Sequence, residues 1–174
     1  DSKIVNPPKI PLSNTQSYSP SVMKQKKYLD AHFKSGNIID YLSSDETRFR
    51  VFPIGEFKQN NRLVAFNIES TNGYHPAKLS IYENFIKSKA EVETIVKLMN
   101  VKYFLSPQKF SNKQAESLSL RRVESGKYYN NFRYLDAYLY EYLNFEPRVQ
   151  FLSNVNYVES KQDGYSLLKR NKFD

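Results

Sequence analysis

The segment from Asn72 to Tyr82 contains the residues whose types and spacing best suit a binding site. Gly73 can adopt the positive φ of a tight turn, and Pro76 suits the first turn of a helix, where its missing N–H is no loss. The free N–H groups of that turn would form a positive helix end able to hold a phosphate or carboxylate. The residues that we expect to contact such a ligand are Tyr74, His75, Lys78 and Tyr82. In the alternative interpretation the Tyr and His only dock the helix on a sheet, and the residue types alone favour this second interpretation.

Other kinds of site chemistry find little support in the sequence. The chain has no Cys, which excludes disulfides, thiolate metal sites and a cysteine nucleophile. His32 and His75 are the 2 histidines, and nothing sets them at metal-ligand spacing. Neither a Gly-x-Ser-x-Gly elbow nor a glycine-rich phosphate loop occurs, and the adjacent acids Asp45 and Glu46 are typical of a solvated loop. We therefore expect no catalytic residue, no bound metal and no cofactor in this chain.

Aromatic and basic residues alternate between Lys127 and Tyr134, and three interpretations remain open for them. The rings could stack on nucleic-acid bases while Arg133 neutralises phosphate. A glycan or lipid-headgroup surface would use the same rings. Packing within a Tyr-rich sheet explains them equally well, and we favour it because no known nucleic-acid-binding motif accompanies the segment.

Hydrophobic periodicity predicts an α/β (α+β) fold, in which a few helices pack on a mixed β-sheet. Residues 1–25 contain four prolines and are expected to form an extended linker or arm, and residues 26–174 a single domain. Helices are predicted over residues 37–43, from 76 to about 86, from about 90 to 100, and over 163–170, with Asn100 closing the third in a left-handed cap. Strands are predicted over residues 49–54, 63–68, 101–105, 118–123, 135–142, 148–152 and 155–158.

The composition is that of a globular chain with an excess of positive charge. Of its 174 residues 15% are aromatic, which argues against disorder. Lys and Arg number 26 against 18 Asp and Glu, a net charge of +8. This charge either attracts a polyanion or only keeps the domain soluble, and we favour the latter. No apolar run approaches the roughly 20 residues that cross a bilayer. Because the chain begins with Asp1 and shows no signal peptide, we expect a processed product or a segment of a longer protein.

The order of several motifs resembles the YfhO-like family of bacterial membrane proteins. Residues 73–82, Gly-Tyr-His-Pro-Ala-Lys-Leu-Ser-Ile-Tyr, resemble the family's Gly-Tyr-His-x-Ala-Lys-Leu-x-x-Tyr segment. Further similarity occurs in the family's order at residues 26–33, 49–51, 98–104, 140–149 and 173–174. The resemblance covers about residues 26–174. Leu143 departs from the Tyr-Glu-Asn type of turn, and the residues before Lys26 match nothing in the family.

This resemblance implies an extracytoplasmic soluble domain, on the periplasmic or outer face of the cell membrane, of a polytopic bacterial cell-envelope protein. The parent would be similar to glycosyltransferases that use lipid-linked sugars, with its catalytic carboxylate in an early loop outside this chain. The chain itself would support the parent or bind a saccharide or acceptor, without catalysis of its own. Its partners would be the transmembrane part of the same polypeptide, a saccharide or lipid-linked sugar, and the membrane surface, but not nucleic acid. The alternatives are a stand-alone basic module that binds nucleic acid or another polyanion, and a purely structural domain.

Overall fold

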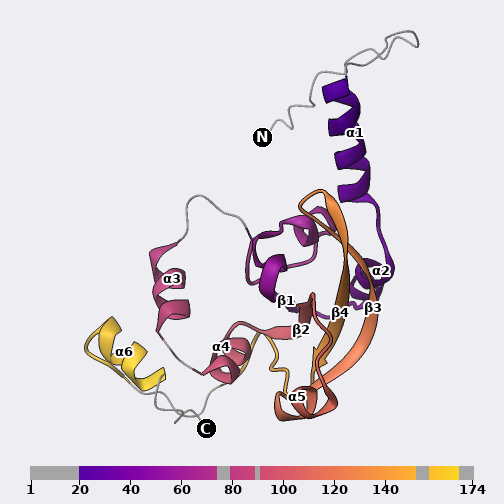
Figure 1. The fold of residues 1–174 in the computed structure, drawn as a ribbon. Coiled ribbons are helices and arrows are strands. Elements are labelled where there is room, and N and C mark those ends of the chain that lie inside the picture. Colours follow the sequence, from indigo (N-terminus) through magenta and orange to yellow (C-terminus); the bar gives the residue numbers. More distant parts are fainter. Residues whose placement is uncertain (1–19, 74–78, 89–90, 152–156, 169–174) are drawn as a thin grey trace.

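The computed structural model describes residues 20–73, 79–88, 91–151 and 157–168 (Figure 1). In these residues one mixed sheet has the strand order β1-β2-β4-β3. Its strands are β1 (Arg50–Pro53), β2 (Val101–Ser106), β3 (Leu120–Asn130) and β4 (Arg133–Tyr142). β1 is parallel to β2, while β4 is antiparallel to both β2 and β3. The predicted α+β fold with a mixed sheet is therefore confirmed.

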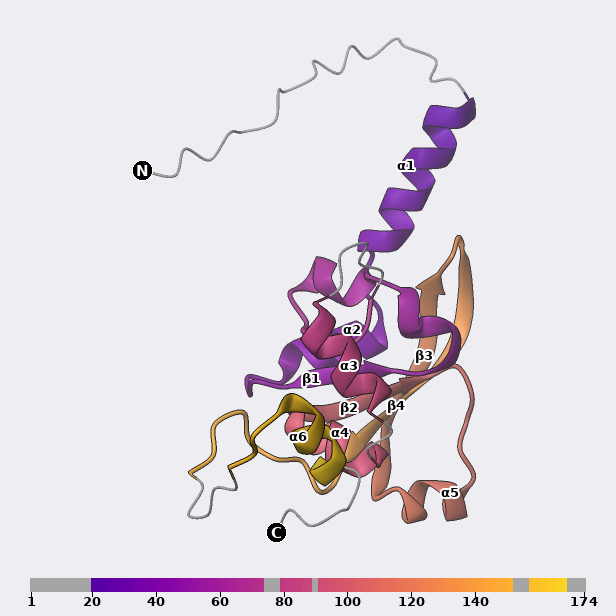
Figure 2. The ribbon, with the colours of Figure 1, turned by 90° about the vertical axis from the view of Figure 1, so that its left-hand side faces the viewer.

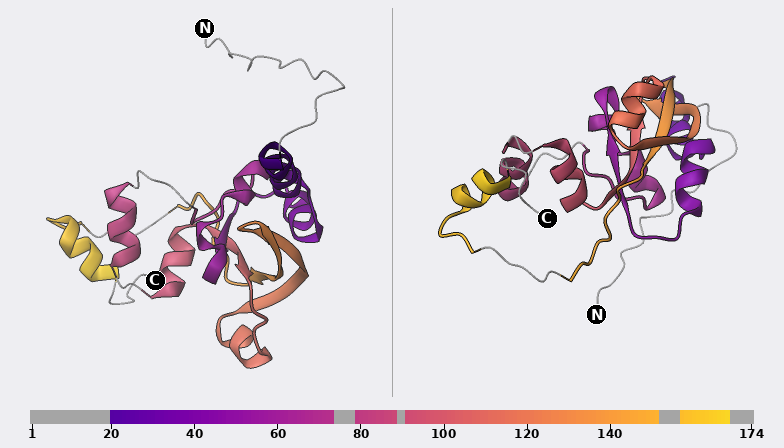
Figure 3. Two further views of the ribbon diagram at one scale, coloured as in Figure 1. Left: turned by 45° about the horizontal axis from the view of Figure 1, so that its top comes forward. Right: turned by 90° about the horizontal axis from the view of Figure 1, so that it is seen from below.

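Helices cover both faces of this sheet (Figures 1 and 3). The α-helices are α1 (Pro20–Phe33), α2 (Asn37–Ser44), α3 (Ser80–Lys87), α4 (Val92–Leu98), α5 (Asn112–Ser117) and α6 (Lys161–Leu168). Two 3₁₀-helices follow β1, namely η1 (Gly55–Gln59) and η2 (Arg62–Phe66). None of the helices in the described residues is long and apolar enough to cross a membrane.

Two hydrophobic clusters lie on opposite faces of the sheet. On the central strand β2, Tyr103 and Leu105 pack in the first cluster and Phe104 packs in the second. This division follows from the pleat, because successive side chains of a strand point to opposite faces. The first cluster is completed by α2, η1 and η2 and the second by α4. Both faces of β2 are thus buried, which explains its short run of apolar residues.

The segment after η2 covers the outer edge of β1. The Val51 N–H donates to the Glu69 carbonyl at 2.9 Å, and the Thr71 N–H donates to the Val51 carbonyl at 3.0 Å. This pairing satisfies the edge of the strand and fixes the backbone of residues 69–71 beside β1. On its other side, the Arg50 N–H donates to the Asn100 carbonyl at 2.9 Å. Asn100 has a φ of 55°, which confirms its predicted left-handed cap at the end of α4.

Several predicted elements are wrong. Residues 63–68 were predicted to form a strand, but they belong to η2 and to a left-handed turn at Asn67. Only the two ends of this apolar run, Leu63 and Ile68, are buried, while Val64 between them is 66% exposed. No strand forms over residues 148–151 or at 157–158, where Val149, Phe151 and Tyr157 are exposed; residues 152–156 lie outside the described residues. The extended arm predicted over residues 1–25 is wrong for residues 20–25, because α1 begins at Pro20, which takes the first helical position that proline tolerates. Residues 1–19 lie outside the described residues.

Candidate functional site

A cleft of about 470 Å³ lies beside the β1 edge of the sheet, where α3 and the end of α4 approach it. Figures 1 and 2 show α3, α4 and α6 together on this side of the molecule. The cleft combines one charged, several hydroxyl-bearing and several apolar side chains. Its lining residues are Arg50, Ser70, Thr71, Tyr82, Phe85, Leu98 and Met99. A concave site with apolar walls and a few convergent polar groups is typical of ligand-binding pockets.

Arg50 is the charged group of the cleft, and two contacts hold its guanidinium. Its Nε donates to Glu69 Oε2 at 3.1 Å, and its Nη1 donates to the Met99 carbonyl at 3.0 Å. The pairing of residues 69–71 with β1 brings the Glu69 carboxylate to Arg50, although 19 residues separate them in the chain. The guanidinium is therefore placed by backbone pairing on one side and by the end of α4 on the other.

A second arginine shares the same carboxylate. Arg148 Nη1 donates to Glu69 Oε1 at 2.6 Å. The loop that carries Arg148 is held in place because Asn100 Nδ2 donates to the Glu146 carbonyl at 2.8 Å. The hydrogen bond from Arg148, supported by Arg50, outweighs the effect of burial and lowers the pKa of Glu69 below its ordinary value. Two guanidinium groups facing one ionised carboxylate leave this cluster with one net positive charge.

Tyr82, one of the predicted site residues, lies in the wall of this cleft. Its hydroxyl donates a hydrogen bond to the Thr71 carbonyl, which ties α3 to the segment beside β1. Burial raises the pKa of Tyr82 although the charge of Arg50 opposes this, so the phenol stays neutral at physiological pH. Phe85, one turn later on α3, adds a second ring to the same wall. The cleft therefore presents two aromatic rings next to a guanidinium.

The other three predicted ligand-binding residues, Tyr74, His75 and Lys78, lie outside the described residues. Pro76, the predicted helix start, also lies outside the described residues. Within the described residues the predicted helix is wrong at Leu79, which is extended, and α3 begins at Ser80.

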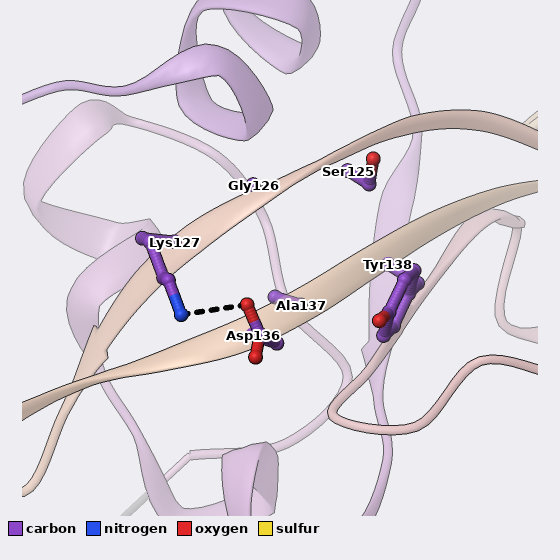
Figure 4. Close-up of a pocket in the computed structure, with 6 residues that line it drawn as sticks. All are labelled: Ser125, Gly126, Lys127, Asp136, Ala137 and Tyr138. Carbon is purple, nitrogen blue, oxygen red and sulfur yellow. Dashed lines mark ion pairs between the residues drawn. The ribbon is translucent and has the colours of Figure 1, made fainter.

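A smaller hollow of about 210 Å³ lies on the β3–β4 hairpin (Figure 4). Its charged groups are Lys127 and Asp136, which face each other across the hairpin with Nζ and Oδ1 2.7 Å apart. Both side chains are largely exposed, and each neutralises the other. The larger cleft, which combines rings with excess positive charge, is the better candidate for a binding site.

The aromatic and basic segment that ends at Tyr134 divides between core and surface. Tyr128 and Tyr129 are buried, so the sheet-packing interpretation holds for them. Phe132 and Tyr134 are exposed, at 70% and 49%, although the ring centroid of Tyr134 lies 5.1 Å from that of Tyr129. A surface role remains open for these two rings.

Asp45 is at the centre of a polar cluster between α2 and β2, and this cluster has a structural role. Its carboxylate accepts hydrogen bonds from Lys102 Nζ at 2.6 Å, from the Thr47 hydroxyl at 2.6 Å and from the Tyr103 hydroxyl at 2.7 Å. Burial opposes ionisation, but these hydrogen bonds outweigh it and hold the pKa of Asp45 well below its ordinary value. A carboxylate with this many partners fastens the end of α2 to the sheet and is not poised for proton transfer.

Within the described part of the chain, no group of three or more His, Cys, Asp and Glu side chains could hold a metal ion. Comparison with family models, curated proteins and solved structures finds no match for this chain. Function is therefore inferred from the geometry of the cleft together with the order of the sequence motifs.

Proposed function

We propose that the cleft between β1, α3 and α4 binds a phosphate-bearing saccharide, such as the head of a lipid-linked sugar, without catalysing its reaction. The chain would act as an extracytoplasmic domain of a polytopic cell-envelope membrane protein similar to lipid-linked-sugar glycosyltransferases. The order of motifs over about residues 26–174 supports this placement. The position of Arg50 beside the rings of Tyr82 and Phe85 supports the ligand class.

The chemistry of the cleft suits a sugar because a sugar has both apolar C–H faces and a rim of hydroxyl groups. The rings of Tyr82 and Phe85 offer flat apolar surface for the C–H face. Arg50 offers a hydrogen-bond donor for hydroxyl groups, and the side-chain oxygens of Ser70 and Thr71 in the same lining can accept hydrogen bonds from them. The net positive charge of the Arg50–Glu69–Arg148 cluster favours a ligand that also carries a phosphate, since guanidinium groups bind phosphate oxygens in pairs.

The same cluster argues against catalysis at this place. Transfer of a sugar needs a general acid or base whose pKa lies near the working pH. Its two arginine partners lower the pKa of Glu69, so this carboxylate stays ionised and cannot donate a proton, and the lowered pKa also makes it a weaker base than an ordinary carboxylate. A binding role fits this arrangement better than an acid–base role.

Titration calorimetry of the purified chain tests ligand binding. The probes are glucose 1-phosphate, glucose and inorganic phosphate. Glucose 1-phosphate is expected to bind more tightly than either of its parts, and Arg50→Gln is expected to weaken binding about tenfold, the loss of one charge-assisted hydrogen bond. The matched control is Arg121→Gln. Arg121 is an exposed arginine of β3, and its Nη2 lies 2.5 Å from Glu141 Oε2 on β4. Equal binding by Arg50→Gln and wild type would refute the assignment of the cleft.

The extracytoplasmic placement has its own test, in which the unsubstituted parent protein is the control, because this chain itself contains no Cys. Ser117, exposed at the end of α5, is replaced by Cys in the parent protein. A membrane-impermeant maleimide is expected to label this Cys in intact spheroplasts. Labelling only after lysis would place the domain on the cytoplasmic side.

A further inference from the structure

The turn that joins β3 to β4 holds Phe132 in a backbone conformation that aromatic residues rarely adopt. β3 ends at Asn130 and β4 begins at Arg133, so the turn consists of Asn131 and Phe132. Their φ values are 45° and 67°. Asn tolerates this left-handed region, but a bulky aromatic residue rarely adopts it, and two-residue hairpin turns of this kind prefer Gly in the second position. The Phe132 side chain is also 70% exposed, so core packing does not explain its presence. Residues held in such conformations concentrate at functional sites.

The hairpin turn is firmly attached to the neighbouring helix η1. Asn60 Nδ2 donates to Asn130 Oδ1 at 2.6 Å and to the Tyr129 carbonyl at 3.2 Å. Asn130 Nδ2 donates to the Glu56 carbonyl at 3.1 Å, and Arg133 Nη2 bonds to Glu56 Oε2 at 2.9 Å. Phe132 is therefore presented from a supported turn.

The base of α1 is attached to the same end of the molecule. Arg62 of η2 is buried, and its Nη2 donates to the Lys34 carbonyl just after α1. The Arg62 guanidinium also lies 5.1 Å from the ring centroid of Tyr128 on β3, a cation–π contact. Residues 26–35, 55–66 and 129–134 thus form one end of the molecule, which we name the α1–hairpin end (Figures 1 and 2).

Positive charge is concentrated at the α1–hairpin end. Its 28 residues contain six Lys and Arg and two Asp and Glu, a net charge of +4 with His neutral, which is half of the +8 of the chain. Its exposed basic side chains are Lys26, Lys27, Lys34, Lys58 and Arg133. Its exposed apolar side chains are Leu29, Phe33, Val64 and Phe132, each at least 50% exposed. By contrast, residues 143–151 and 157–168, which also expose apolar side chains, contain two basic and three acidic residues.

We propose that the α1–hairpin end docks on an anionic lipid bilayer surface. Phe132 enters the boundary between headgroups and acyl chains, and the exposed lysines contact the anionic headgroups. Aromatic rings prefer this interfacial depth, and basic side chains near an anionic surface strengthen the attraction. Lipid fits this end better than nucleic acid. Leu29 and Val64 cannot stack on bases, whereas the transfer of their apolar side chains from water to lipid lowers the free energy. This docking does not depend on whether the cleft binds a sugar.

Vesicle sedimentation with the purified chain tests the proposal. The chain is expected to sediment with vesicles that contain phosphatidylglycerol and phosphatidylcholine, and much less with phosphatidylcholine alone. Phe132→Gly is expected to weaken binding to the mixed vesicles about tenfold, because it removes the inserted ring. This variant suits the turn better than the wild type, so loss of folding does not confound the result. Lys26→Gln combined with Lys27→Gln is expected to weaken binding at least about fivefold, and added salt to weaken binding of the wild type.

Leu143→Ala is the matched control, because Leu143 is 58% exposed just after β4, at the opposite end of the hairpin. It is expected to bind vesicles as the wild type does. If the wild type stays in the supernatant with the mixed vesicles, or Phe132→Gly binds them equally well, the proposal is wrong. If a single-stranded oligonucleotide binds in a Phe132-dependent manner while the vesicles do not, the α1–hairpin end is a nucleic-acid surface instead.

Discussion

Arg50 donates a hydrogen bond from its Nε to Glu69 Oε2 at 3.1 Å, and this contact positions the one charged side chain that lines the cleft. It exists because residues 69–71 pair with the outer edge of β1, which carries Arg50. Arg148 reaches the same carboxylate from a loop after β4, so the cluster joins three separate parts of the chain. The excess of one positive charge that results is the feature on which phosphate binding depends.

Glu69→Gln should strengthen the binding of glucose 1-phosphate. The substitution removes the negative charge of the cluster, so its net charge rises from one to two. We expect glucose 1-phosphate to bind about threefold more tightly at low salt, with a smaller gain at high salt, and glucose to bind no more tightly than before. Calorimetry measures both. Glu141→Gln is the control, since Glu141 pairs with Arg121 away from the cleft. Weaker binding of both ligands would instead mean that the Glu69 carboxylate contacts the sugar hydroxyls.

Tyr82→Phe should separate the structural role of the hydroxyl from the binding role of the ring. The variant leaves the Thr71 carbonyl without its hydrogen bond from α3, so the free energy of unfolding should fall by about 1 kcal/mol. The ring is retained, and the affinity for glucose 1-phosphate should stay within about twofold. Denaturant titration and calorimetry measure the two quantities. Tyr157→Phe, at a tyrosine that is 95% exposed, is the control and should change neither. A loss of affinity without a loss of stability would assign the hydroxyl to the ligand.

Asp45→Asn should destabilise the fold by about 2 kcal/mol, because Lys102 loses its charged partner in a site where both side chains are mostly buried. The pKa of Asp45 in the folded chain lies below its ordinary value of 3.8. The stabilisation by the ionised carboxylate is therefore present above about pH 4 and is lost as the pH falls below that value. Denaturant titrations at pH 7 and at pH values below about 4 should show the wild type approaching the variant. The exposed neighbour Glu46, as Glu46→Gln, is the control. A constant difference between Asp45→Asn and wild type at all pH values would contradict the assigned pKa direction.

Phe132→Gly should raise the free energy of unfolding by about 1 kcal/mol, because glycine adopts the φ of 67° without strain. The reverse substitution is available at Gly55, whose φ is 58° and where an added Cβ would lie 3.1 Å from Pro107 Cγ. Gly55→Ala should therefore lower the free energy of unfolding by about 1 kcal/mol or more. Denaturant titration of both variants measures the free energy of unfolding, which should rise in Phe132→Gly and fall in Gly55→Ala. A destabilised Phe132→Gly would mean that the phenyl ring supports the fold.

Local patterns in the sequence predicted the elements that have strong periodicity. The apolar spacing of Ile38, Ile39 and Leu42 predicted α2, and the short buried run after Asn100 predicted β2. The strand predicted from Leu63 to Ile68 was wrong. The apolar residues of this run suit a buried strand, but tertiary packing buries only its two ends. The helix α5 was missed, although the capping box formed by Ser111 and Gln114 is a recognisable local pattern at its start.

The candidate site was less predictable than the fold. Tyr82 was singled out from its own segment, and the structure places it in the cleft. Arg50, Glu69 and Arg148 could not be found in this way, because their contacts join positions 19 and 79 residues apart. Such contacts depend on which strand edge a segment covers, and no local spacing in the sequence encodes that. Phe132, which lies outside the cleft, was not singled out either, because the predicted strands ended at residue 123 and began at residue 135 and so did not locate the turn after Asn130.

Amide chemical-shift mapping of the ¹⁵N-labelled chain with glucose 1-phosphate tests the central claim most directly, because it locates the ligand as well as detecting it. We predict saturable shifts at Arg50, Thr71, Tyr82 and Met99, which line the cleft, and no shifts at Lys127 and Asp136 in the hairpin hollow of Figure 4. Shifts confined to the hairpin hollow, or no saturable shifts at all, would contradict the assignment of the cleft as the binding site.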